Sequence, residues 1–248
     1  MDVKYFRLTA AELGKDAKIP LKKLGESGEI FYEMALEMVE EIERNNAAGR
    51  RTVFICPVGP VGQYPIFVRL VNERRVDLHN CWFINMDEYL TDEGEWIEES
   101  SKLSFHGFMN RTVYQKLDPA LVMPENQRVF PDPHDLTRIP KLIEELGGVD
   151  ICFGGIGING HVAFNEAQDE LTVDEFANLP TRVLTISRET RVANAIGDLN
   201  GASLPRCRSA RLHAMPSRPG KQKRPQSCAI LPHPQRSRPH LPRRGCAG

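Results

Sequence analysis

The stretch VDICFGGIGINGHVAFNE, residues 149–166, joins a short apolar run to a loop of glycines and polar side chains. The run at 149–153 has the length of a buried strand. The loop contains four glycines between residues 154 and 160, then His161 and Glu166. In parallel α/β sheets, the polar groups that perform chemistry gather beyond the carboxyl ends of the strands. This stretch therefore indicates both a fold and a site.

Apolar runs that predict strands alternate along the chain with segments of helical periodicity. The predicted strands cover residues 52–56, 80–85, 128–130, 149–153 and 183–186. The predicted helices run from an N-cap at Ser27 to Gly49, through 66–70, from about 102 to 117, from about 134 to 146, and onward from Arg188. This alternation predicts a doubly wound α/β fold, with a mostly parallel sheet and helices on both faces.

Charge and composition divide the chain near Ala202. Residues 1–202 hold 21 Lys and Arg against 33 Asp and Glu, whereas residues 203–248 hold 11 Lys and Arg and no acidic residue. Eight of these last 46 residues are proline and only five are Val, Ile, Leu or Phe. Such a segment buries too little apolar surface to offset the entropy of ordering it. We expect one α/β domain over 1–202 and a disordered basic tail over 203–248.

The sequence also favours a cytoplasmic protein. Its first residues carry scattered charges rather than an apolar core like that of a signal peptide, and no apolar run has membrane-spanning length. The cysteines are isolated, with spacings that suit neither a zinc site nor a disulfide framework. We therefore expect a reduced, cytoplasmic protein without a membrane partner.

Acidic and imidazole side chains follow two of the predicted strands. Asp87 comes just after the strand at 80–85, and His161 and Glu166 follow the strand at 149–153. A parallel sheet would bring these three side chains to the same edge, around one pocket. Gly155 and Gly157 would let backbone N–H groups converge on an anion. The alternatives are a tight turn for the glycines and a helix N-terminus for the acids.

Three motifs occur together in one order. They are FINMDEYL at 83–90, GGIGINGHVAFNE at 154–166 and SRETRVANA at 187–195. Over about residues 20–201 the chain resembles the glucosamine-6-phosphate deaminase family. The resemblance implies isomerisation and deamination of glucosamine 6-phosphate to fructose 6-phosphate and ammonia, with no metal or organic cofactor. The 6-phosphogluconolactonases share the fold and a glycine–histidine loop, but the NMDEY and AFNE segments argue against them.

The resemblance also implies a role for each matching residue. Asp87 would be the general base that takes the proton from C2 and returns one at C1. His161 would shuttle the ring-oxygen proton during ring opening, with Glu166 orienting the imidazole or stabilising its charged form. Arg191 would bind the substrate phosphate as a fork of donors.

Two positions depart from the family pattern. The family usually has aspartate at Asn159, where a carboxylate would favour the protonated imidazole. Either Glu166 takes over as the charged partner of His161, which we favour, or ring opening is impaired. In the loop GPVGQYP at 59–65, Gly59, Gly62 and Gln63 stand where the family usually places a hydroxyl for the phosphate. A simple strand-to-helix turn would look the same.

The tail is the largest departure, because the family continues with an apolar helix, a strand and a phosphate-binding lysine. We interpret the abrupt change as a reading-frame shift near codon 203, which translation of the other two frames would test. A genuine basic arm, binding nucleic acid or other polyanions non-specifically, is the less favoured alternative. Either way, we expect reduced stability and low activity. A non-catalytic sugar-phosphate sensor remains the alternative function, and the resemblance allows a homo-oligomer.

Overall fold

The structure is a computed structural model that describes residues 7–9, 11–15, 17–166 and 168–197, with the backbone of 208–211 and 228–229. Its elements, in chain order, are α1 (Ser27–Ala47), β1 (Thr52–Cys56), α2 (Gln63–Arg74), β2 (Cys81–Asn85), β3 (Asp87–Leu90), α3 (Phe105–Met109), the π-helical turn η2 (Asn110–Tyr114), the 3-10 turn η3 (Glu125–Gln127), β4 (Arg128–Val129), α4 (Arg138–Glu145), β5 (Ile151–Cys152), β6 (Gly154–Gly155), α5 (Val173–Ala177), β7 (Arg182–Thr185), α6 (Arg188–Gly197), β8 (Arg208–Arg211) and β9 (Cys228–Ala229).

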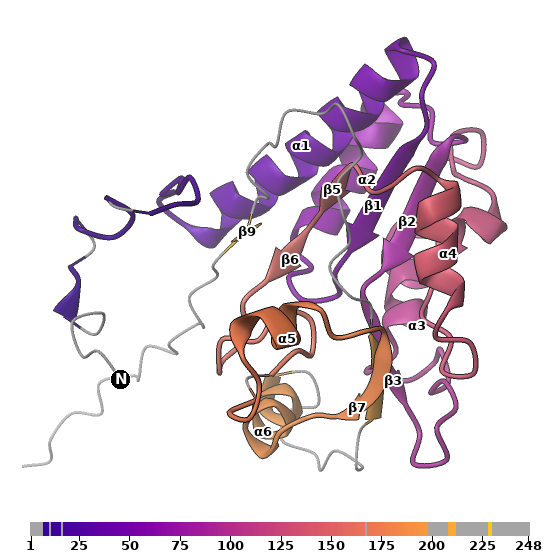
Figure 1. Ribbon diagram of the computed structural model, residues 1–248. Helices are drawn as coiled ribbons and strands as arrows, with labels where there is room; N and C mark the ends of the chain where they lie inside the picture. The colour runs from indigo at the N-terminus through magenta and orange to yellow at the C-terminus, as the bar shows by residue number, and fades with distance from the viewer. Residues whose placement is uncertain are drawn as a thin grey trace, which may run out of the picture.

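The central sheet has the order β4-β2-β1-β5, and all of its pairs are parallel. Figure 1 shows α1 and α2 on one side of this sheet and α4 on the other. The doubly wound fold predicted from the alternating pattern is therefore confirmed. Its longest register pairs β1 with β2 from Thr52–Cys81 to Cys56–Asn85, so both strands end at the same edge.

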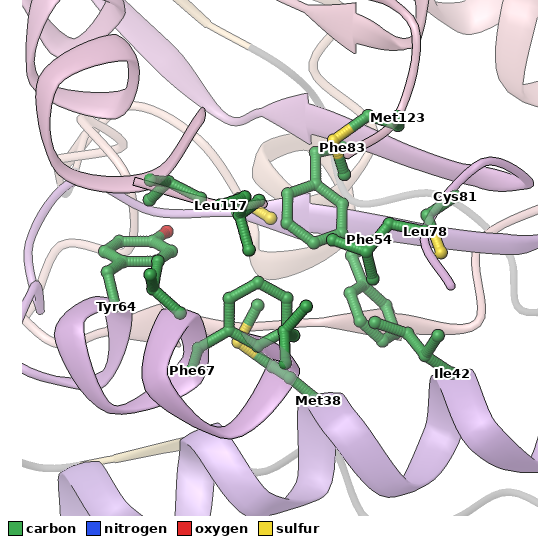
Figure 2. Packing of buried hydrophobic residues seen from close by; sticks show 14 of the residues in the cluster. Met38, Ile42, Phe54, Tyr64, Phe67, Leu78, Cys81, Phe83, Leu117 and Met123 are labelled. Carbon is green, nitrogen blue, oxygen red and sulfur yellow. The ribbon is translucent and has the colours of Figure 1, made fainter. Parts of the chain in front are cut away.

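Side chains alternate between the two faces of these strands, and each face is buried by different helices. On the α1 and α2 face, Phe54 and Phe83 are fully buried and their ring centroids lie 5.7 Å apart. Phe67 of α2 lies 5.7 Å from Phe83, and Figure 2 shows these rings packed together above α1. On the other face, Ile55 and Ile84 pack with the apolar side of α4. Burial of this kind stabilises the sheet by about 1.5–3 kcal/mol for each large side chain.

Several predicted boundaries are corrected by the structure. The N-cap of α1 is Glu26, and Ser27 is the first helical residue. The helix expected over 102–117 is the short α3, which Ser104 caps, followed by the π-helical turn η2. The helix expected over 134–146 begins only at Arg138, because 131–137 form the turns that leave β4. The helix α5 was not predicted.

A second, antiparallel sheet has the order β3-β8-β7 and adjoins the central one. The acids at 87–88 were expected just past a strand end, yet Asp87 is itself the first residue of β3. The chain leaves β2 at Asn85 and enters β3 after one residue, Met86. The predicted loop at 154–166 likewise begins with β6, whose backbone pairs with β9.

The predicted disorder of the tail and its boundary at Ala202 lie outside the described residues. Within 203–248 the structure describes only β8 and β9, by their backbones. In the part of the chain that the structure covers, no helix is both long and apolar enough to span a bilayer.

Candidate active site

Asp87 lies at the carboxyl edge of the central sheet, where its side chain is almost fully buried at 5% exposure. The residue before it, Met86, donates its N–H to the Cys56 carbonyl at 3.0 Å, which ties this point of the chain to β1. Tyr89 shares a face of β3 with Asp87, and its ring centroid lies 5.2 Å from that of Phe164. The face that carries Asp87 is therefore the one on which the 161–166 segment packs.

Two glycine-containing loops meet beside Asp87. A Cβ atom added at Gly155 would lie 2.9 Å from Pro60 Cδ and 3.2 Å from the Gly59 carbonyl oxygen, so the loops approach at backbone distance. A Cβ added at Gly154 would lie 3.6 Å from Met86 Cε. The structure thus brings together the predicted Gly59 loop, the predicted Gly155 loop and the start of β3.

The direct side-chain partner of the His161 ring is Asn159. Asn159 Oδ1 lies 2.5 Å from His161 Nδ1, and it also accepts the His161 backbone N–H at 3.3 Å. The other ring nitrogen, Nε2, lies over Gly157, where an added Cβ would be only 2.1 Å away. Any side chain at position 157 would therefore displace the imidazole. Gly157 is needed here for the space that it leaves.

Glu166 is the acceptor on which this polar network converges. Its Oε2 accepts the Ser187 N–H at 2.6 Å, and its Oε1 accepts the Ser187 hydroxyl at 2.7 Å. Oε1 also accepts a short hydrogen bond from Thr190 Oγ1 and a longer one from Asn159 Nδ2 at 3.3 Å. Glu166 therefore reaches His161 through Asn159 and Thr190.

The charges of the network follow from these contacts. Burial opposes ionisation of Glu166, but the hydrogen bonds from Thr190, Ser187 and Asn159 outweigh it and lower the pKa of the carboxyl. Burial also lowers the pKa of the His161 imidazole, and the charge of Glu166 opposes this without reversing it. At neutral pH the site therefore pairs a carboxylate with an uncharged imidazole.

Three of the residues predicted to bind phosphate, Gly62, Gln63 and Arg191, lie at the N-termini of α2 and α6. Gly62 precedes α2, whose first turn has no acidic residue, so the helix dipole favours an anion there, although the Tyr64 N–H already donates to the Val61 carbonyl at 3.2 Å and Pro65 has no N–H. Gln63 is buried and donates Nε2 to the Pro60 carbonyl at 2.8 Å, so one end of its amide holds the loop. Arg191 lies in the first turns of α6, directly after Thr190.

Ser187 and Thr190 were not predicted as site residues. Thr190 is buried within α6, and its backbone N–H donates to Ser187 Oγ at 3.2 Å in the manner of a helix cap. The sequence does contain this signal, because the S-x-x-T pattern at 187–190 begins the SRETRVANA motif. Ser187 and Thr190 thus form the N-terminal cap of α6 and also donate hydrogen bonds to Glu166.

No protein-family model matches this chain, but curated relatives do. The glucosamine-6-phosphate deaminase of Phocaeicola vulgatus is 32% identical over 147 residues, which are 56% of this chain and 51% of that protein. The glucosamine-6-phosphate deaminase of Dictyostelium discoideum is 27% identical over 180 residues, 68% of this chain and 62% of that protein. The matched region is homologous to the glucosamine-6-phosphate deaminases. The chain spans about half the length of the first of these deaminases.

Solved structures agree on the fold. A monomeric glucosamine-6-phosphate deaminase, described as a missing link of the NagB superfamily, aligns with a TM-score of 0.60 and 23% identity, over 76% of this chain and 74% of that one. The 6-phosphogluconolactonase of Trypanosoma brucei aligns with a TM-score of 0.50 and 15% identity, over 78% of this chain and 76% of its own. Since one fold can host both activities, the choice between them depends on the site.

Within the described residues, no group of three or more His, Cys, Asp or Glu side chains is placed to hold a metal ion.

Proposed function

We propose that this chain is an amino-sugar-phosphate isomerase that deaminates glucosamine 6-phosphate to fructose 6-phosphate and ammonia. The observation that carries the proposal is the hydrogen-bonded set of His161, Asn159 and Glu166, on a loop whose Gly154 lies against Met86, the residue before Asp87. The homology to the deaminases supports the same assignment.

In the proposed reaction, His161 transfers the proton that must move when the pyranose ring opens to the free aldehyde. Asp87 then removes the proton from C2 and delivers one to C1, which converts the 2-amino aldose into a 2-imino ketose. Water adds to the imine carbon, and the C2–N bond breaks to give fructose 6-phosphate and ammonia. Atoms balance with one water consumed for each ammonia released.

The substrate phosphate is assigned to the N-terminus of α2 and to Arg191. The helix supplies a partial positive charge at its N-terminus, and Arg191 supplies a bidentate fork. The convergence of the Gly59 and Gly155 loops is consistent with close approach of an anion to backbone.

The decisive experiment measures ammonia and fructose 6-phosphate formed from glucosamine 6-phosphate by the full chain. Asp87→Asn should lower turnover by about 10²–10⁴-fold, because it removes the general base while keeping the shape of the side chain. The matched control is Asp92→Asn, which changes an exposed acid of the loop after β3 and should leave turnover unchanged.

Two outcomes would replace the proposal. Binding of glucosamine 6-phosphate without ammonia release, unaffected by Asp87→Asn, would indicate a sugar-phosphate sensor. Hydrolysis of 6-phosphogluconolactone in place of deamination would indicate the lactonase activity of the second structural relative.

A further inference from the structure

The environment of His161 Nδ1 carries an inference about Thr190, a residue for which neither the family pattern nor the proposed roles gives a task. Thr190 Oγ1 lies 3.4 Å from His161 Nδ1 and makes a short hydrogen bond to Glu166 Oε1. Thr190 is also 1% exposed and is the one described residue of α6 that is fully buried. Its hydroxyl is therefore placed between a carboxylate and an imidazole, away from water.

The direction of each hydrogen bond in this network can be worked out from Glu166. An ionised carboxylate only accepts hydrogen bonds, so Thr190 must donate its single hydroxyl proton to Glu166. Asn159 must likewise direct its NH₂ group, Nδ2, toward Glu166, which turns its carbonyl oxygen Oδ1 toward His161. One carboxylate thus fixes the orientation of both neighbouring side chains.

His161 Nδ1 consequently faces two oxygens that have only lone pairs to offer, Asn159 Oδ1 at 2.5 Å and Thr190 Oγ1 at 3.4 Å. A lone pair on Nδ1 would repel both, whereas an N–H group satisfies them. In an uncharged imidazole, a proton on Nδ1 leaves the lone pair on Nε2. That nitrogen lies over Gly157, the position without a side chain.

We propose that Thr190 is a positioning residue that, together with Asn159, transmits the orientation of Glu166 to His161 and holds its neutral ring with the proton on Nδ1. The lone pair that accepts the ring-opening proton is then on Nε2, which lies over Gly157. The catalytic part of this inference rests on the proposed deaminase function, whereas the tautomer does not. In place of a charged partner, His161 thus has two uncharged neighbours, Asn159 and Thr190, which are both oriented by the carboxylate of Glu166.

The first test is the ¹⁵N–¹H correlation spectrum of the full chain labelled at histidine, which distinguishes the two neutral tautomers through two-bond couplings. His161→Gln assigns the signals among the seven histidines. We expect the Nδ1–H form at neutral pH. A dominant Nε2–H form in the unsubstituted chain would overturn the proposal without any variant at Thr190.

The second test compares Thr190→Val, which keeps the shape but removes the hydroxyl, with Thr190→Ser, which keeps the hydroxyl. Thr190→Val should bring the Nε2–H form into the spectrum and lower kcat by about tenfold with little change in KM, a loss of the size expected for one hydrogen bond. Thr190→Ser should restore both. Circular dichroism checks that each variant folds.

The two proposals fail separately. If the unsubstituted chain releases no ammonia, the proposed function fails, and the tautomer spectra still decide the role of Thr190. If the chain is active but Thr190→Val leaves kcat and the spectrum unchanged, Thr190 is only a structural residue of α6 and this inference is overturned.

Discussion

The central sheet and the site-bearing segment at 154–197 are built by different forces. Around β1 and β2, Phe54 and Phe83 are fully buried on one face of the sheet, and Ile55 and Ile84 are buried on the other. Among its described residues, the 154–197 segment has buried apolar side chains only at Phe164 and Ile186, neither of them fully buried, and it exposes Ile158 and Ile196. Hydrogen bonds to Glu166 provide much of its order. The sheet therefore fixes where the site lies, and the polar network fixes what its side chains can do.

The largest expected effect is on stability, when one aromatic ring of the central core and one ring beside the site are each replaced by alanine. Phe83→Ala should lower the free energy of unfolding by about 3–5 kcal/mol, because a cavity opens between packed helices and sheet. Phe164→Ala should lower the free energy of unfolding by about 1–2 kcal/mol less than Phe83→Ala does, because the small cluster of Phe164 with Tyr89 and Leu103 can relax around the cavity. Urea unfolding monitored by circular dichroism measures both.

Activity should rank the same two variants in the opposite order. Phe164 packs 6.2 Å from the His161 ring and 5.2 Å from the Tyr89 ring, measured between centroids, so its loss disturbs the site directly. Under conditions where both variants are folded, Phe164→Ala should reduce turnover more than Phe83→Ala. Equal losses of stability and of activity would mean that the two regions are one cooperative unit.

A second prediction concerns Glu88 of β3, which accepts the N–H groups of Phe105 and His106 at the start of α3. Burial raises the pKa of Glu88 to about 7, against the opposing effect of these hydrogen bonds. The folded state thus binds a proton that the unfolded chain releases near its ordinary pKa of 4.5. The protonated Glu88 thus contributes about 3 kcal/mol to the free energy of unfolding. This contribution is complete below pH 4.5 and is lost as the pH rises to about 7.

Urea unfolding at pH 5 and pH 7.5 tests this sign. The parent chain should lose more stability between these two values than Glu88→Gln, which cannot titrate. Glu98→Gln, a change at an exposed acid of the loop before α3, serves as the control and should behave like the parent. A parent and a Glu88→Gln variant with the same pH dependence would contradict the assigned shift.

The smallest expected effect is at the surface, where Glu95 Oε2 lies 2.9 Å from His134 Nε2. The hydrogen bond from Glu95 and its charge raise the pKa of His134, so this pair stabilises below the ordinary histidine pKa and less as pH rises through the raised value. Both side chains are more than 60% exposed, which makes the gain small. Glu95→Gln should lower the pKa of His134, measured by NMR titration, while leaving the midpoint of urea unfolding nearly unchanged. A large shift of that midpoint would show that the pair has a structural role.

The sequence predicts the central sheet well because its strands are continuous apolar runs between polar residues. The strand at 52–56 was placed without error, and the one at 80–85 to within one residue. The strand β3 was missed because its partner β8 follows more than 110 residues later, and such pairing leaves no local pattern. By contrast, the start of α5 has a local sequence signal, the capping box of Thr172 and Glu175, from which this helix could have been predicted.

For the candidate site, the sequence predicts Asp87, His161 and Glu166 at one edge of the sheet, and the structure joins His161 and Glu166 through hydrogen bonds of Asn159. The sequence could not show that Glu166 reaches the His161 imidazole indirectly, because this depends on how α6 packs beside the 154–166 loop. Ser187 and Thr190 enter through that packing. The roles assigned to Asp87, Arg191 and the glycines remain predictions that the proposed assays address.

Asp87 occupies the short passage between two sheets, with Met86 bonded to β1 on one side and the β3–β8 pairing on the other. A residue anchored at both ends in this way has little freedom to shift. If a ligand is to bind between Asp87 and His161 as proposed, the displacement falls to the 154–166 loop and α6, which have few buried apolar side chains among the described residues. The site would then have one stationary half that supplies the carboxylate and one adjustable half that delivers the imidazole to it.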